Sequence, residues 1–155
     1  MPWETEPPIL PSGEVTLHHL TGEWGFSEQM MAQSTRSLPR FRDVPLLSSI
    51  ILTADLAASL RRSLSYRETY EGEPMRCFIP RHGLRFGDAE RGADALVCLE
   101  CHLAYFWVGD RELHYALSET AVSVLTTLFR SAGPASRGLD AAQVLHEASF
   151  PTPAT

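Results

Sequence analysis

The sequence lacks several features that would assign the protein to a broad class. It contains no lysine, so all 13 basic residues are arginine, and 19 acidic residues give a formal net charge of −6. Proteins that bind nucleic acid usually present a basic face, so this balance predicts that no nucleic acid is bound. No apolar run approaches the roughly 20 residues that a membrane-spanning helix needs, so we expect no membrane partner.

The chain is also poor in cysteine and begins without the pattern of a secretion signal. The first residues, MPWETEPP, include neither a basic stretch nor an apolar one. Three cysteines, an odd number, do not suggest a disulfide framework. Both observations predict a cytoplasmic protein, because thiols stay reduced there. No G-x-S-x-G, P-loop, G-x-G-x-x-G or H-E-x-x-H motif is present, so no such motif indicates an enzyme.

What the chain does contain is enough apolar sequence for one globular domain. Its 155 residues are 44% apolar and 21% charged, which is ordinary for a globular protein. We expect an irregular N-terminal lead-in over residues 1–37, an α+β core domain over 38–133, and a C-terminal segment over 134–155 with a frayed tail.

The spacing of apolar residues predicts the order of the elements. Strands are expected at 15–20, 46–52, 75–79, 83–86, 95–108 and 111–117, and helices at 27–35, 54–66, 119–131 and 140–148. Thr53 and Ser118 are the expected N-caps of the two main helices, and Gly109-Asp110 is the expected hairpin turn. The expected fold is therefore an antiparallel meander of about 4–5 strands with two main helices packed on the sheet.

Polar residues that invite a chemical interpretation gather between positions 77 and 102. If 95–108 is one strand, Glu100 and His102 lie on its apolar face, and a buried carboxylate there needs a partner. The nearby candidates are Arg81, His82 and Arg85, since arginine and histidine can pair with a carboxylate or an anion. These five residues form a predicted pocket for a small ligand or an anion.

The three cysteines suggest a second interpretation of the same region, a zinc site. Thiolate and imidazole are ligands that zinc prefers, which predicts Cys77, Cys98 and Cys101, with His82 or His102 as the fourth ligand. Against this, Cys98 and Cys101 face opposite sides of a regular strand, and no nearby Gly or Asn indicates a turn. The alternative is that the cysteines are buried structural residues and that no cofactor is bound.

Two further chemical interpretations use the same residues. Redox Cys-x-x-Cys pairs usually lie at a helix N-terminus, whereas Cys98 and Cys101 lie within a predicted strand. A catalytic site would combine Cys77 or Cys98 as nucleophile with His82 or His102 as base and Glu100 as the residue that orients the base. No spacing in the chain is diagnostic of that chemistry.

One segment resembles a known group of proteins. Cys77-Phe-Ile-Pro-Arg-His-Gly-Leu-Arg85, followed by Val97-Cys-Leu-Glu-Cys101, resembles a family of small uncharacterised bacterial proteins with a Cys-Phe-x-Pro-Arg-His-Gly-Ile/Leu-Arg segment and a Cys-x-x-Cys strand. The resemblance extends loosely from Leu38 to Gly133 and implies no activity. It favours Cys77, Arg81, His82 and Glu100 as members of a shared site.

Two hypotheses for function follow. The first is a small soluble interaction protein, similar in role to an immunity or adaptor protein, without catalytic activity, whose acidic surface binds a protein partner. The second is a metal- or anion-binding pocket, with an enzyme as one form of it, built on the residues between Cys77 and His102.

Overall fold

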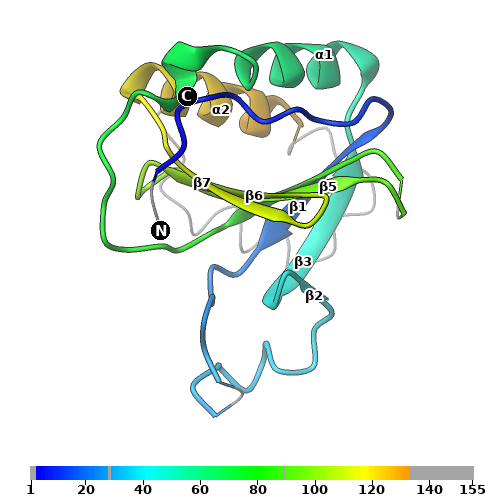
Figure 1. Ribbon diagram of the computed structural model, residues 1–155. Helices are drawn as coiled ribbons and strands as arrows, with labels where there is room; N and C mark the ends of the chain where they lie inside the picture. The colour runs from blue at the N-terminus through cyan, green and yellow to red at the C-terminus, as the bar shows by residue number, and fades with distance from the viewer. Residues whose placement is uncertain (1–2, 28, 89, 133–155) are drawn as a thin grey trace.

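The computed structural model describes residues 3–27, 29–88 and 90–132, and shows two helices covering one face of a curled antiparallel sheet (Figure 1). The strands are β1 (Val15–Leu20), β2 (Arg40–Phe41), β3 (Val44–Ile51), β4 (His82–Phe86), β5 (Ala93–Cys98), β6 (Leu103–Val108) and β7 (Arg111–Ala116). They lie in the order β2-β3-β1-β4-β5-β6-β7 and form a half-barrel. The α+β class is confirmed.

The sheet is larger than the 4–5 strands expected from the sequence. Strands β4 to β7 form a meander, and β1 lies inside the sheet, between β3 and β4, as the third of the seven strands. The predicted register of the last hairpin is confirmed, since Val108 pairs with Arg111 and Phe106 with Leu113. The turn residue Gly109 has a φ of 62°, a value that glycine adopts readily.

The two helices begin at the side chains that the sequence predicts. Helix α1 (Ala54–Ser63) is capped by Thr53, whose hydroxyl accepts from the Leu56 N–H at 3.3 Å. Helix α2 (Glu119–Ala132) begins after Ser118, whose hydroxyl accepts from the Ala121 N–H at 3.1 Å. These caps satisfy N–H groups that have no partner within a helix. A short 3₁₀ helix, η1 (Arg67–Tyr70), follows α1.

The main core lies between the helices and the sheet. Its largest fully buried side chains include Phe86, Phe106 and Tyr115 from the strands and Leu60 and Leu125 from the helices. Apolar residues from β1, β4, β5, β6 and β7 share this face, as strand alternation requires. Burial of this surface is the main source of the stability of the fold.

The opposite face of the sheet is covered by loops rather than helices. Trp24, from the segment between β1 and β2, meets the Phe78 ring edge-on at a centroid distance of 5.0 Å. The Phe78 ring in turn stacks on Tyr105 of β6 at 4.0 Å. The sheet is thus covered on both sides, and Phe78 holds the loop before β4 against it.

The N-terminal lead-in packs against β7, the outer strand at one edge of the sheet. The Glu4 N–H donates to the His114 carbonyl at 2.8 Å, and the Tyr115 hydroxyl donates to the Glu6 carbonyl at 2.7 Å. Farther along, the Arg61 guanidinium donates to the Gly13 carbonyl at 2.8 Å. The lead-in therefore belongs to the folded body.

Within the residues that the structure describes, the predicted helix at 27–35 and the predicted strand at 75–79 are not formed. The described part of 27–35 forms turns, in which the Met30 and Met31 N–H groups both donate to the Ser27 carbonyl. Of its side chains only Met31 is buried, so a helix there would gain little from packing. Residues 75–79 form a loop instead of a strand, because both sides of β4 are already occupied by β1 and β5. The predicted helix at 140–148 lies outside the described residues.

None of the helices in the described ranges is long and apolar enough to cross a membrane.

Candidate functional site

The three cysteines meet at one end of the sheet because the predicted strand 95–108 is interrupted by a turn. Strand β5 ends at Cys98, β6 begins at Leu103, and these two residues pair to close the hairpin. His102, the last residue of the turn, has a left-handed φ of 56°. The expectation of one continuous strand is wrong, and with it the placement of Glu100 and His102 on the apolar helix-side face.

The turn places the sulfurs of Cys98 and Cys101 on the same side of the sheet. The Cys101 N–H donates to Cys98 Sγ at 3.1 Å, across the turn. Both cysteines are fully buried and pack with Leu103 and Ala116. The geometric objection to a shared site for Cys98 and Cys101 therefore does not hold, since His102 supplies the left-handed residue that we expected from Gly or Asn.

Cys77 reaches this pair from the loop before β4. Its Sγ lies 2.7 Å from Cys101 Sγ, and its side chain is exposed to solvent. The loop is held on one side of Cys77 by the stacking of Phe78 on Tyr105 and closed farther on by an ion pair between Arg81 Nε and Glu100 Oε1 at 2.8 Å. Three cysteines from two separate segments thus form one cluster, the cysteine site.

All three thiols have raised pKa values. Burial is the main cause for Cys98 and Cys101, and the contact with Cys101 is the main cause for Cys77. A backbone hydrogen bond with Ile79 lowers the pKa of both buried thiols, but burial outweighs it. The cysteines are therefore protonated at neutral pH, which disfavours a free thiolate nucleophile at this site.

The geometry of the sulfurs must change before they can hold zinc. Within the described residues, no group of three or more Cys, His, Asp or Glu side chains is arranged to hold a metal ion as it stands. Two thiolates on one tetrahedral zinc, each about 2.3 Å from the metal, lie about 3.8 Å apart. Because Cys77 is exposed, rotation of its side chain can open the 2.7 Å contact with Cys101 toward that separation. The three sulfur donors are of the type that zinc prefers.

His82 does not lie with the cysteines. It is on β4 and pairs with Val97, so both face the helices, and its ring stacks on Phe129 of α2 at 4.7 Å. Cys98, the residue after Val97, points to the other face. Of the predicted metal ligands, Cys77, Cys98 and Cys101 therefore lie together, whereas His82 lies on the other face of the sheet.

The five residues of the predicted pocket are divided among different surroundings. Arg81 and Glu100 form the exposed ion pair beside the cysteine site, while His82 lies on the helix side. Arg85 is also on β4, but its Nη1 donates to Asp94 Oδ1 at 2.7 Å instead of pairing with Glu100. His102 serves the turn, where its carbonyl accepts from the Leu117 N–H at 2.7 Å.

Arg85 belongs to a second polar cluster that sequence reasoning missed. Asp94 is buried on β5 and accepts from Arg85 and from Arg42 Nε, the latter at 2.9 Å. The Arg42 guanidinium also lies 4.6 Å from the centre of the Trp107 ring. The signal was present in the sequence, because an aspartate inside the apolar strand Ala-Asp-Ala-Leu-Val-Cys needs a cationic partner.

Comparison with known proteins adds no relative. No protein-family model matches the chain, and neither the curated proteins nor the solved structures give a significant match.

Proposed function

We propose that the protein is a thiolate metal-binding domain that holds a zinc ion between Cys77, Cys98 and Cys101, in a reducing compartment such as the cytoplasm. The proposal rests mainly on the turn after β5, in which the Cys101 N–H donates to Cys98 Sγ. This turn places Cys101 Sγ next to Cys77 Sγ of the loop before β4. Zinc would displace the thiol protons and bind the sulfurs as thiolates.

Three sulfurs leave one of the four positions of a tetrahedral zinc for another ligand. Sites closed by four protein ligands are structural, whereas three protein ligands and an external one are typical of reactive sites. Because Cys77 is exposed, the fourth position of a zinc ion bound there would be accessible from solvent. The fourth ligand proposed for this site is therefore a water molecule or an external group rather than His82, which lies on the other face.

The test is the metal content of the full chain, purified without chelators and measured by mass spectrometry. About one zinc per chain is expected, and Cys77→Ser, Cys98→Ser and Cys101→Ser should each lower zinc affinity by at least about tenfold, because each removes a ligand. His102→Gly is the matched control within the turn and should retain zinc. Absence of binding by folded, fully reduced protein at micromolar zinc would overturn the proposal.

The 2.7 Å contact between Cys77 and Cys101 favours a second candidate function, a reversible disulfide. Because its pKa is raised, the Cys77 thiol would first lose its proton to solvent, and the small thiolate fraction would attack a low-molecular-weight disulfide, forming a mixed disulfide and releasing one thiolate. The Cys101 thiolate would then attack the Cys77 sulfur and release the second, leaving Cys98 as a thiol.

A thiol titration of metal-free protein after incubation with oxidised glutathione separates the two functions. Retention of all three thiols, with tight zinc binding, supports the metal site. Rapid loss of two thiols, with Cys77 and Cys101 linked and zinc bound only weakly, supports the disulfide.

A further inference from the structure

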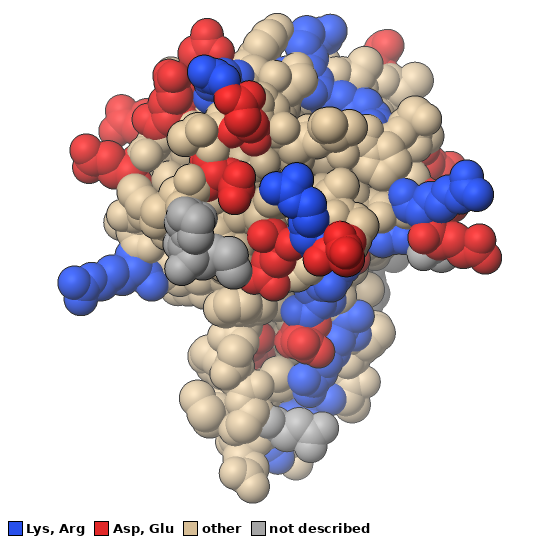
Figure 2. Space-filling model, viewed as in Figure 1, with Lys and Arg blue, Asp and Glu red and all other residues tan. Residues whose placement is uncertain are grey.

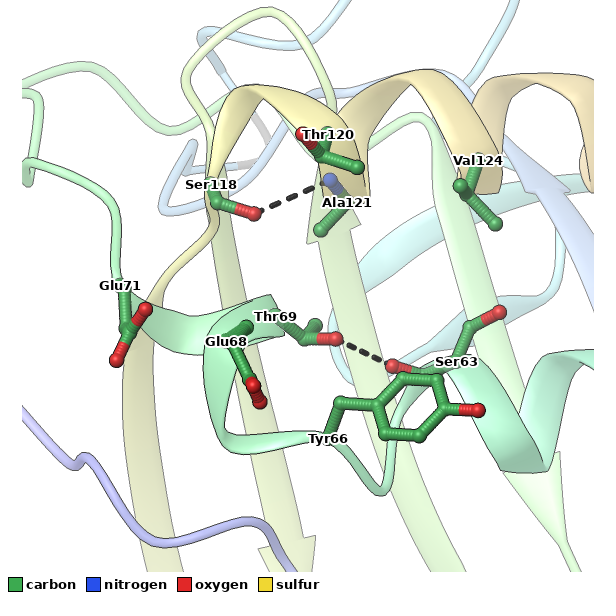
Figure 3. Close-up of a pocket in the computed structure, with 9 residues that line it drawn as sticks. All are labelled: Ser63, Tyr66, Glu68, Thr69, Glu71, Ser118, Thr120, Ala121 and Val124. Atoms are coloured by element: carbon green, nitrogen blue, oxygen red, sulfur yellow. Dashed lines mark hydrogen bonds between the residues drawn. The ribbon is translucent and has the colours of Figure 1, made fainter.

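A hollow lies away from the cysteine site, on the helix side of the molecule. It has a volume of about 600 Å³, which is within the range of pockets that bind ligands. Its wall is formed by the end of α1, by η1 and the residues around it, and by the first turns of α2 (Figure 3). The lining residues are Ser63, Tyr66, Glu68, Thr69, Glu71, Ser118, Thr120, Ala121 and Val124.

Two exposed apolar side chains border this hollow. Tyr66 is 52% exposed and Val124 is 38% exposed, and both line the hollow itself. The buried Ala121, one turn before Val124 on α2, is also part of the lining. A concave surface with an exposed aromatic ring and an aliphatic side chain can bury an apolar side chain from another molecule.

The other part of the wall is acidic. Glu68 and Glu71 line the hollow and are exposed, and within the described part of the chain neither is paired with a basic side chain. Arg67, which lies between Tyr66 and Glu68 in sequence, is paired with Glu6 instead. Figure 2, seen as in Figure 1, shows acidic side chains gathering over the side where α2 begins.

This combination selects one kind of occupant. The acidic wall favours cationic groups, and arginine fits best because its guanidinium binds carboxylates in a bidentate manner and stacks on an aromatic ring such as that of Tyr66. The apolar border favours a leucine, methionine or phenylalanine next to that arginine. A free metal cation or a polyamine would use the carboxylates and leave Tyr66 and Val124 unused.

We propose that this hollow docks a segment of a partner protein in which arginines flank an apolar side chain. The arginines lie against Glu68 and Glu71, and the apolar side chain lies between Tyr66 and Val124. The net charge of −6 attracts such a segment over a longer range. The proposal does not depend on zinc, because none of the three cysteines lines the hollow.

The test uses the full chain as purified and a fluorescein-labelled peptide of eight residues that alternates pairs of leucine and arginine. Fluorescence anisotropy measures the dissociation constant at 50 and 200 mM salt. We expect micromolar binding that weakens at the higher salt concentration, because part of the attraction is between exposed charges. No binding at 1 mM protein would overturn the proposal.

Two double variants distinguish binding in this hollow from the general attraction of a basic peptide to an acidic protein. Glu68→Gln with Glu71→Gln, which keeps the shape of both side chains, should weaken binding by about tenfold, as expected for lost charge-assisted hydrogen bonds. The matched control is Glu90→Gln with Asp110→Asn, which removes the same charge at the opposite end of the sheet and should change binding less than twofold. Equal weakening by the two double variants would overturn the proposal.

The apolar part has its own test. Val124→Ser should weaken binding of the leucine–arginine peptide several-fold while leaving the protein folded, since Val124 is exposed. A peptide in which glycine replaces leucine should bind at least about tenfold more weakly than the original, because it buries no apolar side chain. If the glycine–arginine peptide binds equally well, the surface recognises charge alone and the docking proposal fails.

Discussion

Substitution of His102 tests whether this residue belongs to the turn or to the metal. Its φ of 56° lies in the left-handed region, where a side chain costs about 1–2 kcal/mol and glycine costs nothing. Glycine also loses about 0.5–1 kcal/mol more conformational entropy on folding. His102→Gly should therefore stabilise the protein by about 0.5–1 kcal/mol, as the difference between these effects.

A β-branched residue at the same position should have the opposite effect. Histidine and valine both bear the cost of the left-handed region, but a β-branched side chain is rarely found there, so His102→Val should make the protein less stable than the wild type. Within the described residues the imidazole of His102 makes no hydrogen bond, so neither substitution removes one.

Thermal and urea unfolding of the variants measure these differences. A change of 1 kcal/mol corresponds to about 2–4 °C in Tm for a chain of this size. The glycine variant should melt highest and the valine variant lowest, and the glycine variant should keep its zinc. If the glycine variant is folded but has lost zinc, His102 is a ligand and the assignment of it to the turn is refuted. If glycine and valine variants are equally stable, the argument from φ is refuted.

Three further predictions concern other residues of the fold and site. Asp94→Ala leaves the partly buried Arg85 and the exposed Arg42 without their carboxylate and should destabilise the protein by about 2 kcal/mol in urea unfolding. A loss below about 0.5 kcal/mol would be the contrary result. In Gly72→Ala the added Cβ would lie 1.9 Å from the Leu117 carbonyl oxygen, so the backbone must move. We expect the free energy of unfolding to fall by about 2 kcal/mol or more, and an unchanged Tm would contradict this. Because burial raises the pKa of the Cys98 and Cys101 thiols, zinc must displace protons at pH 7, so its affinity should fall steeply as the pH is lowered. Calorimetry in two buffers of different ionisation enthalpy should show about one proton released per thiolate formed, and binding without proton release would disprove thiolate ligation.

Local signals in the sequence predicted the parts of the fold that depend on neighbouring residues. The caps Thr53 and Ser118 were identified because a hydroxyl before an apolar stripe can accept from the first N–H groups of a helix. Gly109 indicated the last hairpin because a two-residue turn needs a residue that adopts a positive φ readily. Taking Gly109-Asp110 as the whole turn then determined the register of β6 and β7.

Pairing between distant segments could not be predicted in the same way. Nothing local to Val15–Leu20 indicates that β1 lies between β3 and β4, because that position depends on which strands meet after the chain folds. The interruption at residues 99–102 was missed because its left-handed residue is His102, whereas Gly or Asn is the usual indicator of such a turn. This one error placed Cys98 and Cys101 on opposite faces in the prediction and was the main argument against the metal site that the three cysteines suggested.

The contact between the lead-in and β7 also covers part of one edge of the sheet. An outer strand presents unpaired N–H and C=O groups, which another chain can use to extend the sheet. Here the His114 carbonyl accepts from Glu4, and the Ala116 carbonyl accepts from Gly72, so two outward groups of β7 are already used. At the other edge, β2 has only two residues and offers little to pair with. Cleavage of the lead-in by a protease is therefore expected to free the His114 carbonyl and the neighbouring part of this edge for pairing with a strand of another chain.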